Sequence, residues 1–355
     1  MEQDLLCKIP GPLLAWYDKN ARVLPWRQDP QPYYVWVSEI MLQQTRVEAV
    51  KPYFDRFITA LPTVAALAEA PEEQLLKLWE GLGYYNRVRN LHKAAKIVME
   101  NYHGQLPADF ETLLTLPGIG KYSAGAIASI AYGIPMPAVD GNVLRVTARV
   151  LASEEDITKE QVIYDISSRL QKILPRDRVG DFNQALMELG ALICLPVGKA
   201  QCLLCPLRHL CRGYEQGIYM ELPKKAPKKQ RRIEDRTVFV IISQQRVLIA
   251  KRGEKGLLAG LWELPNTQGA MDETQCREYL FLRGAKINKI VSLGKAKHIF
   301  SHVEWHMTGY GVYLEEENFP WEDAVWASAR ELGESYALPT AFKAYTGQIK
   351  KLLCE

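Results

Sequence analysis

Several features are missing from this sequence of 355 residues. It contains no uninterrupted apolar run long enough to cross a bilayer and no internal repeat. It also lacks a basic N-terminal segment followed by an apolar stretch, the pattern that directs secretion. The net charge is only +3, from 44 basic and 41 acidic residues, so it neither demands nor excludes a polyanionic partner. We therefore expect a cytoplasmic protein whose thiols stay reduced.

The composition that remains is typical of globular proteins, with 48% hydrophobic and 24% charged residues. This balance excludes an intrinsically disordered chain, a collagen-like fibre and a small disulfide scaffold. The length favours two domains over one.

The pattern of apolar residues changes along the chain. Up to about residue 213, helical spacing predicts amphipathic helices over residues 33–45, 86–102, 122–131, 141–151 and 182–193. Later segments predict strands over 237–243 and 246–250 joined by a polar turn, more strand structure over 298–314, and a closing helix over 338–353. The expected fold class is a mainly α N-terminal domain, residues 1–222, followed by an α+β domain, residues 236–355.

A basic segment separates these two regions. Residues 223–232 contain six Lys or Arg, two prolines and no acidic residue, which is typical of an exposed linker, and we place this linker at 223–235. The same segment can lie along a polyanion, and the two interpretations are compatible.

Four of the seven cysteines are clustered with the spacing C-x7-C-x2-C-x5-C: Cys194, Cys202, Cys205 and Cys211. In a reducing compartment this clustering indicates metal ligation rather than disulfides. Four thiolates suit either a [4Fe–4S] cluster or a four-cysteine zinc site. The single C-x2-C pair favours iron–sulfur, because zinc ribbons use two such pairs.

A glycine turn, Leu-Pro-Gly-Ile-Gly-Lys at residues 116–121, joins two predicted helices and predicts a helix-hairpin-helix element. Gly118 and Gly120 permit positive φ and a close approach of the backbone to a ligand. The free N–H groups at the start of the next helix, beside Lys121, can then bind a phosphate oxygen. An ordinary tight joint between helices has the same pattern.

Two acidic residues occupy positions that suit acid–base chemistry. Glu39 lies in an apolar, uncharged helical stretch with Gln43 on the same side, and burial there raises the pKa of a carboxyl toward neutrality. Asp140 opens a predicted helix, whose N–H groups stabilise its negative charge. A surface position for Glu39 and a simple capping role for Asp140 are the more common explanations of such residues, and from the residues alone they are favoured.

Four motifs occur in a fixed order along the N-terminal region. They are Ser-Glu-Ile-Met-Leu-Gln-Gln-Thr at 38–45, Leu-Pro-Gly-Ile-Gly-Lys-Tyr-Ser-Ala-Gly-Ala-Ile at 116–127, Val-Asp-Gly-Asn-Val at 139–143, and the cysteine cluster. As a set they closely resemble the MutY-type adenine DNA glycosylases of the endonuclease III, helix-hairpin-helix superfamily. The C-terminal region is similar to the Nudix-like recognition domain of that family, including Phe300-Ser301-His302.

The resemblance implies a monofunctional DNA repair glycosylase that flips adenine out of double-stranded DNA and hydrolyses its N-glycosidic bond. The substrates would be adenine opposite 8-oxoguanine and, in addition, adenine opposite guanine. The protein would act as a nucleoid-associated monomer that carries a [4Fe–4S] cluster and has no membrane partner.

The resemblance also implies roles for individual residues. Glu39 would protonate adenine and Asp140 would stabilise the sugar cation, supported by Tyr122 and Asn142. The adenine pocket would be lined by Trp26, Arg27, Leu42, Val47 and Gln184. Gln44 and Tyr84 would wedge into the base stack, with Thr45 on the side of the opposing lesion. Phosphate contacts would come from Gly118, Gly120 and Lys121, and recognition of 8-oxoguanine from Phe300, Ser301 and His302. The cluster ligands would be Cys194, Cys202, Cys205 and Cys211.

Three departures from related patterns bear on these expectations. The first cysteine gap, residues 195–201, has seven residues where the family usually has six, and we expect the cluster to tolerate the insertion. The C-terminal domain lacks the acidic run that holds magnesium in Nudix hydrolases, so it should bind rather than cleave. Tyr122 stands where bifunctional relatives have a Schiff-base lysine, and Lys121, about 100° away around a helix, should meet phosphate instead.

Three alternative functions fit parts of the sequence. They are a glycosylase-lyase for oxidised pyrimidines, a non-catalytic iron–sulfur DNA-binding protein, and a nucleotide pyrophosphohydrolase. Tyr122 argues against the first, the pair of carboxylates against the second, and the missing acidic run against the third.

Overall fold

The computed structural model describes residues 5–196, 198, 200–227 and 230–353. Residues 197 and 199 of the first cysteine gap and residues 228 and 229 of the expected linker therefore lie outside the described part. The contacts divide the chain into two compact units. One unit contains Met1–Ala70 and Asn86–Pro227, and the other contains Pro71–Tyr85 and Lys228–Glu355. We call Pro71–Tyr85 the docked segment, because it lies in the first half of the chain but belongs to the second unit.

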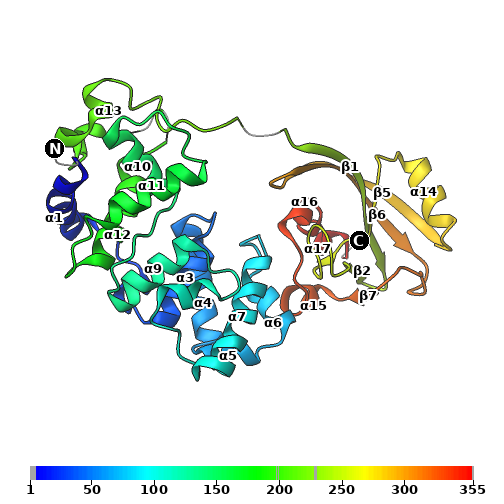
Figure 1. Ribbon diagram of the computed structural model, residues 1–355. Helices are drawn as coiled ribbons and strands as arrows, with labels where there is room; N and C mark the ends of the chain where they lie inside the picture. The colour runs from blue at the N-terminus through cyan, green and yellow to red at the C-terminus, as the bar shows by residue number, and fades with distance from the viewer. Residues whose placement is uncertain (1–4, 197, 199, 228–229, 354–355) are drawn as a thin grey trace. The chain divides into compact units, whose positions relative to one another are not determined.

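The N-terminal region is helical, as predicted (Figure 1). Its α-helices are α1 (Pro10–Asn20), α2 (Pro25–Gln28), α3 (Pro32–Leu42), α4 (Val47–Ala60), α5 (Val64–Glu69), α6 (Glu72–Leu78), α7 (Asn86–Tyr102), α8 (Phe110–Leu114), α9 (Lys121–Tyr132), α10 (Gly141–Leu151), α11 (Glu160–Gln171), α12 (Val179–Leu192) and α13 (Arg212–Glu215). Three short 3₁₀ helices accompany them: η1 (Leu5–Lys8), η2 (Cys202–Leu204) and η3 (Arg208–Leu210). The predicted helices correspond to α3, α7, α9, α10 and α12, with small shifts at their ends. Within the described residues, no helix is both long and apolar enough for a bilayer.

Local sequence signals explain where these helices begin and end. Proline occupies the first turn of α1, α2 and α3, where its missing N–H leaves no unpaired donor. The side chains of Thr63, Asp109 and Asp140 cap α5, α8 and α10 by accepting backbone N–H groups. Helices α1, α10, α11 and α12 then pack around one apolar cluster, which also includes Leu207 from the cysteine segment.

The C-terminal region contains a mixed sheet. Its strands are β1 (Arg232–Ser243), β2 (Arg246–Lys251), β3 (Trp262–Glu263), β4 (Asn266–Gln268), β5 (Ile287–Ile299), β6 (Val303–Leu314) and β7 (Ala324–Ala327). The strand order among the described residues is β3-β2-β1-β6-β5, with β4 paired to β1 and β7 to β2. Strands β1 and β6 run parallel, and β5 and β6 form an antiparallel hairpin. The predicted hairpin of β1 and β2 is confirmed, and both turn residues, Gln244 and Gln245, adopt positive φ.

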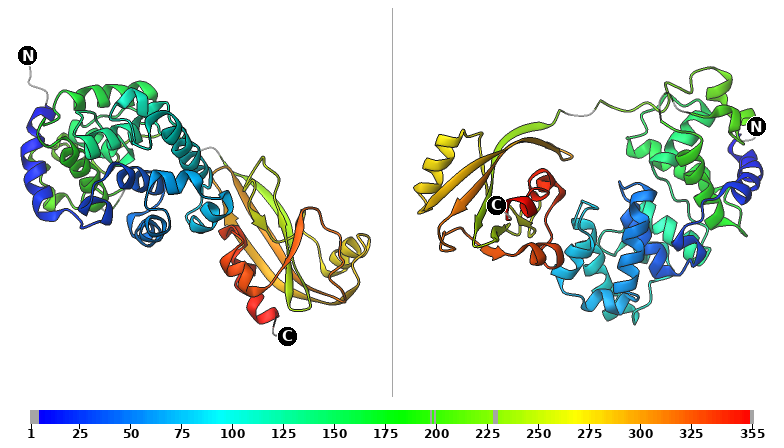
Figure 2. Two further views of the ribbon diagram at one scale, coloured as in Figure 1. Left: turned by 90° about the horizontal axis from the view of Figure 1, so that it is seen from below. Right: turned by 180° about the vertical axis from the view of Figure 1, so that it is seen from behind.

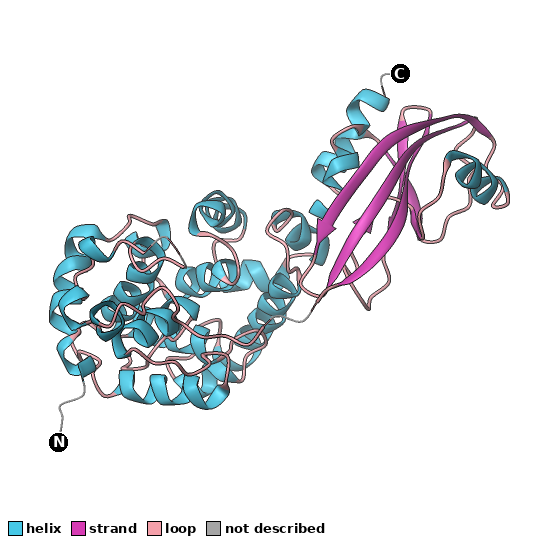
Figure 3. Ribbon diagram, turned by 90° about the horizontal axis from the view of Figure 1, so that it is seen from above, coloured by secondary structure: helices cyan, strands magenta, loops and turns pink. Residues whose placement is uncertain are grey.

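Helices cover both faces of this sheet (Figures 2 and 3). Because side chains alternate along a strand, Val238, Val240 and Ile242 of β1 pack toward the C-terminal helices. Phe239 and Ile241 face the other way and pack against α14 (Glu273–Phe281). The C-terminal elements are α15 (Ala329–Glu334), the 3₁₀ helix η4 (Thr340–Phe342), α16 (Lys343–Thr346) and α17 (Ile349–Leu352).

The prediction of one closing helix over residues 338–353 is wrong. The apolar residues Phe342, Tyr345, Ile349 and Leu352 recur at helical spacing and do pack against the sheet. However, the chain divides into η4, α16 and α17, and α16 ends at Thr346 just before Gly347. Glycine destabilises a helix interior, so one continuous helix is not favoured through Gly347. The short helical elements still place the four apolar side chains against the sheet.

Candidate active site

Glu39 lies on α3 and its side chain is buried, with 5% of the residue exposed. This excludes the surface interpretation of Glu39. The hydroxyl of Tyr122 donates a hydrogen bond to Glu39 Oε2 at 2.7 Å. Burial raises the pKa of Glu39 to about 7, although that hydrogen bond opposes the shift, and the charge of Asp140 raises the pKa further. The carboxyl can therefore hold a proton near neutral pH.

Tyr122 is the second residue of α9 and lies beside Glu39. Burial and the charge of Glu39 raise the pKa of Tyr122 well above its usual value, so the phenol stays protonated. Its hydroxyl also lies 3.2 Å from Met187 Sδ. The preceding residue, Lys121, is exposed on the same helix. The two neighbours therefore differ in environment, as expected from their angular separation on a helix.

Asp140 caps α10 and accepts three hydrogen bonds. Its Oδ1 accepts the backbone N–H groups of Asn142 at 2.9 Å and Val143 at 2.8 Å. Its Oδ2 accepts Asn142 Nδ2 at 2.7 Å. Burial nevertheless raises the pKa of Asp140, and the hydrogen bonds and Arg145 only oppose this shift. The helix start stabilises the anion as predicted, but the desolvation cost is larger than that stabilisation.

Two buried arginines on α10 contact the cysteine segment, and one of them also contacts Asn142. Arg145 donates from Nη2 to Asn142 Oδ1 at 2.9 Å and from Nε to the carbonyl of Cys194 at 2.8 Å. One turn later, Arg149 donates from Nη1 to Cys194 Sγ at 3.3 Å and to the carbonyl of Leu195 at 2.7 Å. Hydrogen bonds to charged groups are strong, so these contacts fix the cysteine segment against α10.

The four clustered cysteines line one small cavity, together with Arg149 and Leu207. Burial raises the pKa of Cys205 to about 12, and the charge of Cys194 adds to this effect. Burial and the same neighbouring thiol also raise the pKa values of Cys202 and Cys211. Within the described residues, no three His, Cys, Asp or Glu side chains already form a metal-binding group. The sulfurs thus surround a common space without forming a compact ligand set.

Arg27 and Trp26, from the predicted adenine pocket, lie on α2. Trp26 is buried with its ring centroid 5.1 Å from that of Phe54. Arg27 Nη2 lies 2.9 Å from Glu188 Oε2, and Arg27 lowers the pKa of Glu39 through its charge. The other predicted pocket residues are partly exposed on α3, α4 and α12: Leu42, Val47 and Gln184.

Glu188 is a residue that the sequence reasoning missed. It is 1% exposed and forms ion pairs with both Arg27 and Arg22, the latter at 2.7 Å. Although burial raises its pKa, the hydrogen bonds from the two arginines hold the pKa of Glu188 below its ordinary value. An acid within the apolar stretch of α12 is the same signal that identified Glu39, and it could have found Glu188.

Arg87 is a second missed residue, and it organises the turn after α3. Its Nη1 donates to the carbonyls of Ile40, Met41 and Gln43 at 3.1, 2.8 and 2.6 Å. Its Nη2 donates to Thr45 Oγ1 at 3.2 Å. Between these contacts, Gln44 is exposed and held at a φ of 58°. A non-glycine residue in the left-handed region is strained, and it keeps this conformation only where surrounding contacts hold the turn in place.

The predicted helix-hairpin-helix element consists of α8, a turn and α9. Gly118 has a φ of 81°, which favours glycine, whereas Gly120 has an ordinary φ of −96° and forms the N-cap of α9. The expectation of positive φ therefore holds for Gly118 alone. Lys121 and Tyr122 also line a cavity of about 460 Å³ together with Val139.

The remaining predicted residues belong to the second unit. Phe300, Ser301 and His302 form the turn between β5 and β6. Phe300 packs edge-on against Trp305, with ring centroids 4.9 Å apart, whereas Ser301 and His302 are exposed. Tyr84, from the docked segment, is 50% exposed, has a φ of 48°, and places its hydroxyl 3.2 Å from Ser301 Oγ. The structure thus brings one predicted wedge residue to the predicted lesion-sensing turn.

Comparisons with known proteins match both regions of the chain. Residues 37–172 match the family described as HhH-GPD superfamily base excision DNA repair protein, and residues 237–348 match the NUDIX domain. The adenine DNA glycosylase of Homo sapiens is 34% identical over 95% of this chain and 74% of its own length. The adenine DNA glycosylase of Buchnera aphidicola subsp. Schizaphis graminum is 36% identical, over 83% and 84% respectively. The solved structure of a thermostable thymine-DNA glycosylase is 28% identical over 58% of this chain and 94% of its own, with a TM-score of 0.53.

Proposed function

Since this chain belongs to the adenine DNA glycosylase family of DNA repair enzymes, we propose that it removes adenine paired with 8-oxoguanine or guanine from duplex DNA by hydrolysing the N-glycosidic bond. The observation that carries the proposal is the buried, Tyr122-bonded carboxyl of Glu39, whose pKa lies at about 7. A group with that pKa is half protonated near neutrality and can donate a proton without a large penalty.

Glu39 is the proposed general acid. Adenine is a poor leaving group until it is protonated, and Glu39 would deliver its proton to N7. The C1′–N9 bond then breaks with its electron pair moving to the purine, leaving a cationic sugar. Water would attack this sugar at C1′ and lose its proton to the Glu39 carboxylate. Tyr122, whose raised pKa keeps its hydroxyl protonated, would orient the carboxyl and receive no proton itself.

Asp140 is the proposed stabiliser of the cationic sugar. Its three hydrogen bonds, two from backbone N–H groups and one from Asn142, support the ionised form at a buried position. The pairing of one proton-holding carboxyl with one hydrogen-bonded carboxylate resembles the division of labour in glycoside hydrolysis. Asn142 would keep Asp140 oriented, because its own carbonyl accepts from Arg145.

The proposed chemistry requires the adenine to leave the base stack, which costs a few kcal/mol. Gln44 and Tyr84 are both exposed and both adopt a left-handed backbone conformation. Groups wedged into the gap offset the cost of unstacking. The free N–H groups at the start of α9 and the exposed Lys121 would bind a backbone phosphate beside this gap. On the other side of the pair, Ser301 and His302 would contact 8-oxoguanine, while Phe300 anchors their turn.

The four clustered cysteines would hold a [4Fe–4S] cluster. Their donor set fits this group, because four sulfurs line one cavity and their mutual repulsion would be relieved by a bound cation. When bound, the cluster would cross-link the segment that Arg145 and Arg149 attach to α10, without acting on the base. Iron and acid-labile sulfide analysis of the purified protein, with Cys205→Ala losing both, tests this assignment. Zinc in place of iron would contradict it.

We further propose that the enzyme is monofunctional and acts as a nucleoid-associated monomer. The exposed Lys121 lies next to Tyr122, whose hydroxyl contacts Glu39. A lysine that is to form a Schiff base must itself reach the sugar, and the Glu39 side of α9 carries Tyr122 instead.

One assay tests the central proposal. Labelled duplexes with adenine opposite 8-oxoguanine are incubated with the protein and then run with and without hot alkali. We expect cleavage at the adenine only after alkali, because base loss leaves an alkali-labile site. Strand cleavage without alkali, or an adduct trapped by borohydride, would favour a glycosylase-lyase, and an intact strand after alkali would exclude adenine removal.

A further inference from the structure

The docked segment presents an unexplained feature of the second unit. In sequence, Pro71–Tyr85 lies between α5 and α7, yet its contacts group it with Lys228–Glu355. It carries α6 and ends next to Tyr84, the proposed wedge. None of the motifs that resemble the family lies in α6, so the proposed function does not explain how this helix is held.

Lys77 on α6 makes a complete set of hydrogen bonds to the C-terminal elements and to its own helix. Its Nζ donates to the carbonyls of Leu332 and Tyr336 at 3.1 and 3.0 Å, and pairs with Glu80 Oε2 at 2.7 Å. An ammonium group has three donors, and all three are satisfied here. The two carbonyls lie in and just after the last turn of α15, where carbonyls lack helical partners and attract a cation.

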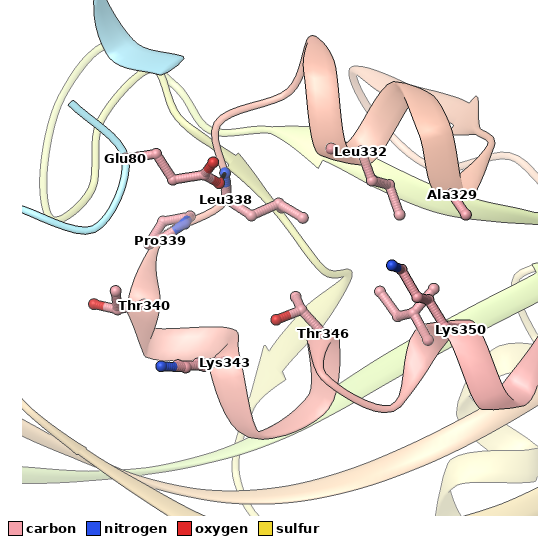
Figure 4. Close-up of a pocket in the computed structure, with 11 residues that line it drawn as sticks. Glu80, Ala329, Leu332, Leu338, Pro339, Thr340, Lys343, Thr346 and Lys350 are labelled. Carbon is pink, nitrogen blue, oxygen red and sulfur yellow. Dashed lines mark hydrogen bonds between the residues drawn. The ribbon is translucent and has the colours of Figure 1, made fainter. Parts of the chain in front are cut away.

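Glu80 completes the same arrangement from the other side. Its Oε1 accepts the backbone N–H of Leu338 at 2.8 Å, and Figure 4 shows this carboxylate beside Leu338. A cavity of about 300 Å³, lined by Glu80, Leu332, Leu338 and Ile349, borders the contact. Along this open edge the hydrogen bonds add to the burial of Leu75 and Leu76 in holding α6.

One ion pair joins the segment to the sheet, but it is weak. Lys251 on β2 lies 3.2 Å from Glu73, and both side chains are substantially exposed. Exposed pairs of this kind contribute at most about 1 kcal/mol. The side chains of Lys77 and Glu80, 20% and 29% exposed, are more buried than this pair and bond directly to the C-terminal elements.

The attachment extends to Tyr84 through a short run of backbone contacts. Trp79, between Lys77 and Glu80, is fully buried and donates from Nε1 to the carbonyl of Gly83 at 3.1 Å. The carbonyl of Trp79 accepts the N–H of Leu82 at 3.1 Å. These bonds fix the turn that holds Tyr84 in the left-handed region with its hydroxyl near Ser301.

We propose that Lys77 and Glu80 are positioning residues for recognition of the base opposite the adenine. They hold the docked segment on the C-terminal elements so that Tyr84 and Ser301 meet that base as one rigid group. The inference rests on the proposed function, because it assigns these residues to the discrimination between 8-oxoguanine and guanine. Neither residue contacts a reacting atom in this scheme.

The test measures single-turnover adenine release from duplexes that carry 8-oxoguanine or guanine opposite the adenine. Lys77→Met removes all three hydrogen bonds and keeps the apolar stem, and Glu80→Ala removes the acceptor of Leu338. We expect the ratio of the two rates to fall about tenfold in each, the effect of losing one charged hydrogen bond. The rate with guanine should change by less than about twofold. Lys77→Arg can donate to the same carbonyls and should restore the ratio.

Arg330→Met is the matched control, since it removes an exposed cation from α15 whose ion pair is with Glu334 on the same helix. The ratio of the adenine-release rates with 8-oxoguanine and with guanine should be the same in Arg330→Met as in the wild type. Equal losses with both duplexes in Lys77→Met would show a merely structural role and overturn the inference. An unchanged ratio in Lys77→Met and Glu80→Ala would overturn it as well, while leaving the proposed function intact. A wild-type protein without preference for 8-oxoguanine would overturn that part of the proposed function and this inference together.

Discussion

The two regions of the molecule differ in where they keep charged side chains. In the described part of the chain, every buried acidic or basic residue belongs to the helical unit: Glu39, Arg87, Arg145, Arg149 and Glu188. The buried polar residues of the strand region are the uncharged Thr237 and Ser243. Burying a charge is costly unless it is paired or hydrogen-bonded, and all five residues have hydrogen-bond partners among the contacts described above. The helical unit therefore accepts a cost in stability that the strand region avoids.

The strand region presents its candidate groups at the surface instead. Ser301 and His302 are exposed on a turn that Phe300 anchors to the apolar core. Exposed polar groups on a rigid scaffold suit recognition, because they can bind a ligand without the protein having to bury a charged side chain. The comparison indicates that changes in the helical unit should affect the chemical step, and changes in the strand region should affect the choice of substrate.

The largest effect is expected for Glu39→Gln. Glutamine preserves the shape and can still accept from Tyr122, but it has no proton to donate at neutral pH. General acid catalysis contributes about 10²–10⁴-fold, so we expect single-turnover adenine release to fall by about 10³-fold. Gel-based quantification of alkali-labile sites measures this rate directly.

The affinity of Glu39→Gln for the same duplex should remain close to that of the wild type and serves as its control. The pH dependence provides a second check. Because the pKa of Glu39 is raised to about 7, the active, protonated form predominates below that pH and disappears as the pH rises through it. The wild-type rate should therefore decline above neutrality. Release by the variant at the wild-type rate would refute the role of Glu39.

A smaller but still large loss is expected for Asp140→Asn. The neutral amide can keep part of the cap on α10 but cannot stabilise a cationic sugar. Loss of one electrostatic stabiliser typically costs about 10²–10³ in rate. Single-turnover release and thermal unfolding should be measured together, and a rate loss without a matching loss of stability supports the assignment. Retention of the wild-type rate would restrict Asp140 to the role of a helix cap.

An effect on selectivity rather than rate is expected in the strand region. Replacing Ser301 and His302 with alanine removes their polar groups but leaves Phe300 packed on Trp305. We expect the preference for adenine opposite 8-oxoguanine over guanine to fall by about tenfold, as for one or two lost hydrogen bonds. Phe300→Ala is the informative companion, because it should move the turn itself. If both variants discriminate like the wild type, the turn has no part in recognition.

The features that could be predicted from the sequence are those that depend on residues close together along the chain. The helices, the capping role of Asp140 and the apolar surroundings of Glu39 are local, and the hairpin turn at Gln244 and Gln245 was visible as two polar residues between strands. The prediction of one closing helix was wrong because the helical spacing of apolar residues gives no sign of the interruption at Gly347. The contact of Tyr122 with Glu39 spans 83 positions, and the resemblance implied only that Tyr122 supports the site.

The residues that were missed have partners far away in the sequence. Arg87 bonds to backbone carbonyls 44 to 47 positions earlier, and Glu188 pairs with Arg27 across 161 positions. Lys77 bonds to carbonyls more than 250 positions later. A backbone carbonyl carries no sequence signature, so only the three-dimensional structure can identify such an acceptor. The chemical groups of the site were more predictable than the residues that hold them.

The smallest effects are expected in the turn of the helix-hairpin-helix element, where two glycines have different requirements. Gly118 has a φ of 81°, and an added Cβ would lie 2.8 Å from the Cβ of Asn90. Gly118→Ala should therefore lower the free energy of unfolding by about 1–2 kcal/mol, the cost of a side chain in the left-handed region. Gly120 has an ordinary φ and open space around its Cβ position, so Gly120→Ala should leave stability unchanged.

If the turn approaches a phosphate, the new methyl group of Gly120→Ala should still weaken DNA binding, because only a bare backbone lets the N–H groups of α9 reach the anion. Denaturant unfolding and duplex affinity separate these cases. Loss of stability in both variants, or full affinity in Gly120→Ala, would reduce the turn to a joint between two helices.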